Sequence, residues 1–122
     1  SHRLVNPKFS DEENLAIYGK CAYPNGHGHN YEIEVTVAGE PVVDTGMIMD
    51  LKKMADIIEE EILVKVDHRH LNFDVDFLTG IIPTAENLAM VFWKRLAPKI
   101  TAGRLHSIRV YETANNFAEY RG

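Results

Sequence analysis

The sequence predicts an α+β fold in which a four-stranded antiparallel sheet carries two helices on one face. Three patterns support it: strand-like alternation over 31–37, helical periodicity in two later stretches, and a strand–turn–strand pattern near the C-terminal end. A chain of 122 residues is large enough for one hydrophobic core, so we treat residues 1–122 as a single domain.

The first strand follows from the alternation of apolar and polar residues between Tyr31 and Val37. A period of two is typical of a strand with one covered face. Extended backward, the alternation places His27 and His29 on the apolar face. We expect the segment beginning at Ser1 to be the hairpin partner of this strand, and residues upstream of this sequence to complete that segment.

Apolar residues at helical spacing predict two helices. The first begins after Asp50, a suitable N-cap, and runs from about 51 to 65. Its apolar stripe consists of Leu51, Met54, Ala55, Ile58, Ile62 and Val66. The stretch from Asp67 to Gly80 lacks a sustained period and is predicted to be a loop. The second helix opens at Pro83-Thr84, with Thr84 as its cap, and ends near Pro98.

The stretch from Leu105 to Tyr120 is typical of two strands around the turn at 114–116, because asparagine tolerates the positive φ of tight hairpin turns. In the first of these strands, Ile108, Val110 and Glu112 share one face. The other face of the sheet is expected to be polar, with Glu32, Glu34, Thr36, Arg109 and Thr113. An open sheet leaves two unpaired edges, so we expect the chain to form oligomers.

Composition limits the classes of partner. The net charge is -5 and no block of basic residues occurs, which argues against general affinity for nucleic acids or anionic membranes. No apolar run approaches the roughly 20 residues of a membrane span, and no signal-peptide pattern opens the sequence. The single cysteine, Cys21, rules out an internal disulfide and fits a reducing cytoplasm, where we expect the protein to be.

His27 and His29, separated by one glycine, indicate a metal site. In an extended chain both imidazoles project from the same face and can reach one cation. A catalytic zinc takes three protein ligands and keeps one exchangeable position. His2 is the candidate for the third ligand, because its segment is the expected hairpin partner. The alternative is a histidine pair that belongs to the surface or the core.

Other side chains have a chemical and a structural interpretation. A lone cysteine such as Cys21 is usually a small buried hydrophobe. Near a dication its pKa falls, and the thiolate can accept a proton from a substrate. Asp67 would orient His68 and make it more basic if the two are paired; otherwise both are solvated loop residues. We assign no role to His70 or His106.

Glu112 is a carboxylate on a face that is otherwise destined for the core. Burying an unpaired charge is costly, so we expect it at a strand end facing a polar cavity. There it could accept two parallel hydrogen bonds from an amidine-like or guanidine-like ligand edge. A lysine or arginine partner within the protein is an equally good interpretation.

Several blocks of this sequence together resemble the 6-pyruvoyl-tetrahydropterin synthase family, and the resemblance covers essentially the whole chain. They are Ser1-His2-Arg3-Leu4, Gly19-Lys20-Cys21, Asn25-Gly26-His27-Gly28-His29-Asn30-Tyr31, Asp67-His68 with Leu71-Asn72, Pro83-Thr84-Ala85-Glu86-Asn87, and Val110-Tyr111-Glu112-Thr113. The roles implied are zinc binding for His2, His27 and His29, catalysis for Cys21, Asp67 and His68, and pterin binding for Glu112, Thr84, Ala85 and Glu86. Ala85 departs from relatives that carry threonine or serine there, so we expect no side-chain contact to substrate from it.

The resemblance also implies an assembly. In the family's tunnelling fold, three subunits close a barrel and two trimers stack into a homohexamer. Neighbouring subunits then pair their sheet edges. Active sites lie between subunits, so Cys21 and the zinc of one chain are expected to meet Asp67 and His68 of another.

The implied activity is that of a carbon–oxygen lyase of tetrahydrobiopterin biosynthesis. Zinc, Zn2+, would bind the side-chain hydroxyls of 7,8-dihydroneopterin triphosphate as a Lewis acid. The product would be 6-pyruvoyl-tetrahydropterin, formed by an internal redox exchange with release of triphosphate. Lys20, Arg3 and Arg69 are unranked candidates for binding the triphosphate.

Three alternatives remain. The queuosine branch of the family, 6-carboxytetrahydropterin synthase, sheds the side chain as acetaldehyde; it usually has three residues between the cysteine and the first histidine, where this chain has the five of the pyruvoyl branch, 22–26. A third branch replaces the cysteine with glutamate, which Cys21 disfavours. A zinc-stabilised pterin-binding protein without catalysis is the last, and an open coordination position beside a thiol favours an enzyme over it.

Overall fold

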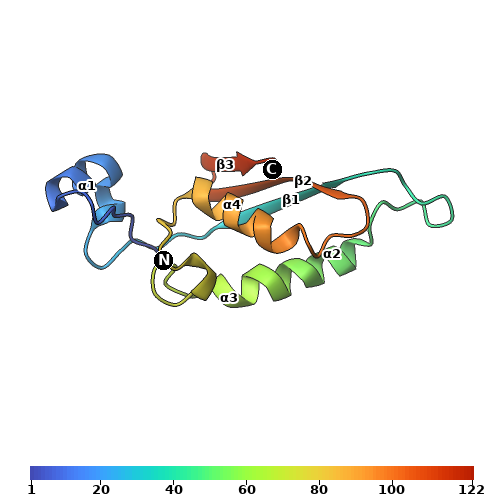
Figure 1. Ribbon diagram of the computed structural model, residues 1–122, viewed down its shortest axis with the longest axis horizontal. Helices are drawn as coiled ribbons and strands as arrows, with labels where there is room; N and C mark the ends of the chain where they lie inside the picture. Colours follow the sequence, from blue (N-terminus) through green and yellow to red (C-terminus); the bar gives the residue numbers. More distant parts are fainter.

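The computed structural model describes residues 1–122 and has the α+β class that the sequence predicts. Three antiparallel strands form one sheet in the order β1 (Glu32–Ala38), β2 (Arg104–Thr113) and β3 (Asn116–Tyr120). The helices α2 (Leu51–Ile58), α3 (Val64–Val66) and α4 (Ala85–Leu96) lie along one side of this sheet (Figure 1). The helix α1 (Asp11–Tyr18) projects at one end of the molecule, and the loop between β1 and α2 projects at the other (Figure 1).

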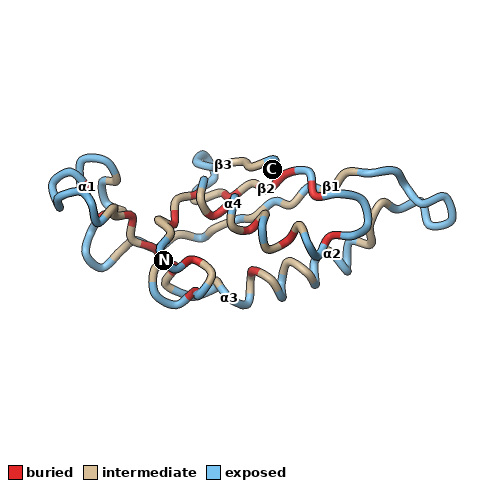
Figure 2. The backbone as a smooth tube through the Cα atoms, viewed as in Figure 1, coloured by how far each residue is buried: buried red, intermediate tan, exposed pale blue.

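The core lies between the sheet and α4. Strand pairing places Ile33 opposite Val110 and Val35 opposite Ile108, so these side chains share the covered face. Ile108 and Val110 are fully buried, as are Leu88 and other residues of α4 that pack against them. Figure 2 shows this burial concentrated along β2 and α4, whereas α1 and the β1–α2 loop are largely exposed.

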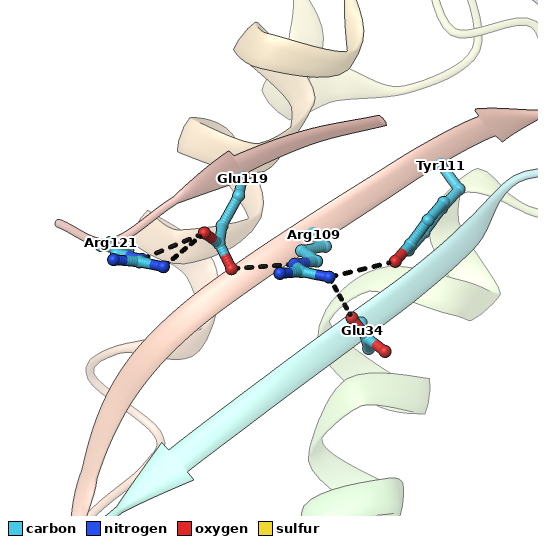
Figure 3. A network of polar contacts seen from close by, with 5 residues as sticks. All are labelled: Glu34, Arg109, Tyr111, Glu119 and Arg121. Carbon is cyan, nitrogen blue, oxygen red and sulfur yellow. Dashed lines mark hydrogen bonds and ion pairs between the residues drawn. The ribbon is translucent and has the colours of Figure 1, made fainter. Parts of the chain in front are cut away.

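The opposite face of the sheet is polar, as predicted, and its charges are paired with one another (Figure 3). The Arg109 guanidinium donates to Glu119 Oε1 at 2.9 Å and lies 3.8 Å from Glu34 Oε2. Arg109 also donates to the Tyr111 hydroxyl at 3.4 Å, and Arg121 donates to Glu119 Oε2 at 3.0 Å. Because these charges satisfy one another, the open face of the sheet needs no covering layer.

The sheet has three strands, so the prediction of a fourth strand is not confirmed. The N-terminal segment forms only an isolated bridge, between His2 and His27, and does not extend the sheet. His27 and His29 precede the first residue of β1, so they lie in a loop rather than on the apolar face of a strand. Gly26 has a φ of 77°, which turns the chain just before His27.

The two predicted helices are confirmed, with one irregularity. α2 and α3 are joined by a π-helical turn, Glu59–Leu63, so the helical path runs from Leu51 to Val66. Arg95 of α4 donates from Nε to the Glu61 carbonyl at 2.8 Å and pairs with the Glu61 carboxylate at 3.2 Å. Arg95 thus bonds both the backbone and the side chain of this turn. Hydrophobic periodicity carried no sign of this turn.

The caps at both helix starts are also as predicted. Asp50 accepts from the Lys52 amide, and Thr84 accepts from the Asn87 amide. A third helix, α1, was not predicted because it lacks an apolar stripe. Its start carries a capping box in which Ser10 and Glu13 bond to each other's backbone amides, and this sequence signal could have found it. Two short 3-10 turns, Gly19–Ala22 and Asp76–Leu78, complete the elements.

None of the helices combines the length and the apolar character needed to cross a bilayer.

The core predicts a large stability effect at Ile108. Truncation of this fully buried side chain in Ile108→Ala should lower the free energy of unfolding by about 2–5 kcal/mol, because apolar contacts are lost and a cavity remains. Urea denaturation at fixed protein concentration measures it. The matched control is Thr36→Val on the exposed face of β1, expected to change the same quantity by less than about 0.5 kcal/mol. Equal effects of the two substitutions would contradict the assignment of the core face.

Candidate active site

Residues 1–4, which we call the central segment, are hydrogen-bonded on both sides. On one side His2 exchanges two backbone bonds with His27, at 3.0 and 2.7 Å, and the Leu4 amide donates to the Cys21 carbonyl at 2.7 Å. On the other side the Leu71 amide donates to the Ser1 carbonyl at 2.8 Å. The central segment therefore joins the loop that carries Cys21 and His27 to the loop that follows Asp67 and His68.

Gly26 is required for this close approach. A side chain at position 26 would place its Cβ 2.6 Å from the His2 carbonyl oxygen, which is a clash with backbone. Together with the positive φ of 77°, this leaves glycine as the residue that fits.

The His2 ring is fully buried and held in one orientation. Its Nδ1 lies 3.0 Å from the Pro83 carbonyl oxygen and 2.7 Å from the Tyr31 hydroxyl. A carbonyl can only accept, so the bond to Pro83 places the proton on Nδ1; the Tyr31 oxygen then accepts from the same N–H, and Nε2 keeps its lone pair. Nε2 in turn lies 3.1 Å from Nε2 of His29. This is the arrangement of a histidine ligand whose second nitrogen is fixed by a backbone carbonyl.

Electrostatics keep these rings neutral near pH 7. Burial lowers the pKa of His2 from 6.5 to about 4. Burial also lowers the pKa of His29, and the neighbouring His27 lowers it further. Burial, followed by the charges of Glu112 and Cys21, raises the pKa of Tyr31, so its hydroxyl stays protonated. Neutral imidazoles with free lone pairs are what a metal ion needs.

The distances between these groups fit a zinc ion. Two imidazole nitrogens on a tetrahedral zinc, each about 2.0–2.1 Å from the metal, lie about 3.3 Å apart. The 3.1 Å between His2 Nε2 and His29 Nε2 is close to this value. The Cys21 sulfur belongs to the same group, since the ligand atoms of His2, Cys21 and His29 all lie within 4.8 Å of one another.

His27 lies at the edge of this group. Its ring packs edge-on against that of His29, with 4.7 Å between centroids, but the residue is exposed and is not among the three whose ligand atoms cluster. The structure thus brings two of the three predicted ligands to bonding separation, places the third beside them, and adds the predicted catalytic cysteine.

The predicted pterin-binding residues line one cavity of about 390 Å³. It is formed by Leu4, Thr84, Ala85, Glu86, Glu112, Asn115, Asn116 and Phe117. Burial raises the pKa of Glu112, Glu86 raises it further, and His27 lowers it. Glu112 forms no ion pair within the chain, so the alternative of a lysine or arginine partner is not found. Its position next to Glu86 leaves room for a ligand that donates hydrogen bonds.

Cys21 is electrostatically coupled to this cavity. Burial, and then the charge of Glu112, raises the pKa of the Cys21 thiol. In the metal-free protein Cys21 is therefore a neutral thiol, and the thiolate expected from the sequence requires a nearby dication to offset both effects.

Asp67 and His68 form the predicted pair, with 2.9 Å between Asp67 Oδ1 and His68 Nδ1. Their side chains are 72% and 93% exposed, and His68 has a φ of 56°, which is rare outside glycine. They line a cavity of about 440 Å³ together with His29, Asn30 and Tyr31. Cys21 lines neither this cavity nor that of Glu112, whereas His29, which belongs to the same group as Cys21, lines the cavity of the pair.

Sequence reasoning missed three contributors to the site. They are Tyr31 and the Pro83 carbonyl, which fix the His2 ring, and the turn at Asn115 and Asn116, which lines the cavity of Glu112. Tyr31 had a usable signal, because it continues the spacing of His27 and His29. The Pro83 carbonyl belongs to the backbone, so no residue type in the sequence indicates its role.

Comparison with known proteins identifies the family. The family described as 6-pyruvoyl tetrahydropterin synthase matches residues 1–122. The 6-pyruvoyl tetrahydrobiopterin synthase of Homo sapiens is 45% identical over 122 residues, covering 100% of this chain and 84% of the human protein. The chain belongs to the 6-pyruvoyl tetrahydropterin synthase family. The Dictyostelium discoideum protein of the same name is 44% identical over 122 residues, covering 100% of this chain and 88% of that protein.

The fold of this 6-pyruvoyl tetrahydropterin synthase family member is also that of a solved structure. Caenorhabditis elegans 6-pyruvoyl tetrahydropterin synthase superposes with a TM-score of 0.91 at 38% identity, covering 99% of this chain and 86% of that chain. The sequence resemblance is thereby confirmed at the level of family and fold.

The lowered pKa of His2 predicts acid sensitivity of the metal-free protein. Between pH 6.5 and about 4 the unfolded chain binds a proton at His2 that the folded chain excludes, so stability falls on acidification across this window. In His2→Asn, whose amide can replace Nδ1, the slope of unfolding free energy against pH should be shallower by up to about 1.4 kcal/mol per pH unit. Denaturation in a chelator at several pH values measures it. An unchanged slope would mean that His2 titrates normally.

Proposed function

We propose that this chain converts 7,8-dihydroneopterin triphosphate to 6-pyruvoyl-tetrahydropterin with release of triphosphate, a lyase step of tetrahydrobiopterin biosynthesis. The observation that carries the proposal is the meeting of Cys21 with His2 and His29 beside the cavity of Glu112. Membership of the 6-pyruvoyl tetrahydropterin synthase family supports it, and so do the names of the human and Dictyostelium relatives.

His2, His27 and His29 would hold zinc in this proposal. His29 needs little movement relative to His2, whereas His27 has to turn its exposed ring toward the same point. A bound dication supplies Lewis acidity, which polarises substrate hydroxyls and lowers the pKa of neighbouring groups. Cys21 is left as the base rather than a ligand.

Glu112, Cys21 and His68 would each perform a different part of the reaction. Glu112 accepts two hydrogen bonds from the aminopyrimidinone edge of the pterin and fixes the ring in the cavity. Cys21, as thiolate, removes a proton from a carbon of the substrate side chain. His68, oriented by Asp67, exchanges protons during the tautomerisation that accompanies loss of triphosphate. The redox exchange is internal, between side chain and ring, so no external hydride donor is needed.

The placement of Asp67 and His68 supports an active site shared between subunits. The pair is exposed and lines a cavity that Cys21 does not line, and both groups are needed for the proposed reaction. We infer that the pair serves a neighbouring chain in a cytoplasmic homohexamer, as the family resemblance implies. The unpaired sheet edges at β1 and β3 are available for subunit pairing.

Three other functions remain in competition, of which the side-chain-cleaving branch is disfavoured by Cys21. The queuosine branch uses the same substrate and zinc, and the spacing between Cys21 and His27 argues against it. A non-catalytic pterin-binding protein would have no use for a thiol among histidine ligands or for an exposed Asp67–His68 pair.

Product analysis discriminates among these functions. We expect zinc-loaded protein incubated with 7,8-dihydroneopterin triphosphate to release triphosphate and yield 6-pyruvoyl-tetrahydropterin, identified by mass. Acetaldehyde would select the queuosine branch, hydroxymethylpterin the side-chain-cleaving branch, and the absence of turnover the binding protein. Any of these three results would overturn the proposal.

The role of Cys21 as base predicts a separation of binding from turnover. Cys21→Ala should retain zinc and pterin binding but lose turnover by at least about 100-fold, because proton removal typically contributes that much. Metal analysis, pterin titration and product assay of the same preparation measure it. The control is His106→Ala, an exposed histidine outside both cavities, expected to behave as the parent chain. If Cys21→Ala loses its zinc, the residue is a ligand instead.

A further inference from the structure

The backbone of the central segment is hydrogen-bonded by one side chain, that of Asn72. Asn72 Oδ1 accepts from the Arg3 amide at 2.7 Å, and Asn72 Nδ2 donates to the Arg3 carbonyl at 2.8 Å. One amide thus makes the two bonds that a paired residue makes in an antiparallel ladder. The neighbouring Leu71 amide continues the pairing with its bond of 2.8 Å to the Ser1 carbonyl.

This contact bears on His2 through the geometry of an extended chain. Successive residues of such a chain direct their peptide groups to opposite sides. His2 is bonded on one side to His27, and Arg3 is bonded on the other side to Asn72, so the two contacts together limit rotation about the segment axis. Asn72, beside the bond from Leu71 to Ser1, supplies the restraint nearest to His2 on that side and thereby limits the direction of the His2 ring.

Asn72 is itself well anchored. The backbone N–H of Asn72 donates to His70 Nδ1 at 3.3 Å, and the backbone N–H of His70 donates to Asp74 Oδ2 at 3.0 Å. The adjacent Leu71 and the nearby Val75 are both 4% exposed and belong to the core. The loop is therefore packed into the core on either side of Asn72, and Asn72 connects it to the central segment.

We propose that Asn72 is a positioning residue for the metal site, setting the His2 imidazole although it touches neither metal nor substrate. The inference rests on the proposed zinc site. It goes further by assigning the affinity of that site in part to a residue outside the ligand set, on the loop that also carries Asp67 and His68. The two bonds between the Asn72 side chain and the Arg3 backbone are called the clamp below. Loss of this clamp would let His2 move away from His29 and weaken zinc binding.

The chain contains a matched control in Asn14. Its Oδ1 accepts from the Asn6 amide at 2.8 Å and its Nδ2 donates to the Asn6 carbonyl at 3.1 Å, which repeats the clamp a few residues further along the chain. Asn14 is 2% exposed and also donates to two other carbonyls, but contacts none of the metal-site residues. Its removal reports the general cost of losing such a clamp.

The experiment measures zinc affinity by competition with a chromogenic chelator, using the full chain and variants Asn72→Ala, Asn72→Asp and Asn14→Ala. Melting temperatures of the metal-free proteins are recorded beside it. We expect Asn72→Ala to bind zinc about tenfold more weakly, at the lower end of what partners of metal ligands contribute. Asn72→Asp, which keeps the acceptor but loses the donor, should fall between; it carries the test if Asn72→Ala does not fold. Asn14→Ala should lower the melting temperature while keeping zinc affinity within about twofold of the parent chain.

Two results would overturn the inference. Equal zinc affinity of the parent chain and both Asn72 variants would remove the positioning role and leave the proposed zinc enzyme standing. Equal weakening by Asn14→Ala and Asn72→Ala would make the effect one of general stability. A parent chain that binds no zinc would instead overturn the proposed function, and the inference with it.

Discussion

The site depends on one constraint, the hydrogen bonding of residues 1–4 on both of their edges. This central segment contacts the loop at 21–27 through His2 and Leu4, and the loop at 71–72 through Ser1 and Arg3. Neither loop belongs to the sheet, and no other element joins them by backbone pairing. The sheet and α4 supply the stable body of the molecule, whereas the central segment brings the chemically active residues into one place.

Burial of a histidine at this point has a cost that the structure offsets locally. A buried polar group without partners costs about 1–3 kcal/mol, and a buried charge costs more. His2 avoids both penalties because it is neutral and because the Pro83 carbonyl and the Tyr31 hydroxyl lie at bonding distance from Nδ1. The bonds that remove the penalty also determine which nitrogen is free. The same contacts therefore stabilise the buried His2 ring and leave its Nε2 free to bind a metal.

Much of the fold followed from periodicity, and most of the candidate site did not. The alternation at 31–37, the stripes of α2 and α4 and the caps at Asp50 and Thr84 are local signals, and the structure agrees with them. The π-helical turn is contacted by Arg95, a residue distant in sequence, and α1 has no apolar stripe. At the site, the spacing of His27 and His29 indicated a metal. His2 was a candidate ligand because its segment was the expected hairpin partner, whereas the catalytic role of Cys21 beside it came from resemblance to a family.

The central claim is that zinc is bound by the histidines positioned around the central segment, with the Cys21 sulfur left free to act as base. X-ray absorption at the zinc edge of the metal-loaded protein tests it most directly. The account predicts a first shell of nitrogen or oxygen atoms at about 2.0–2.1 Å with the signature of imidazole rings. A sulfur atom at about 2.3 Å would contradict it, because Cys21 would then be a ligand and could not remove the substrate proton.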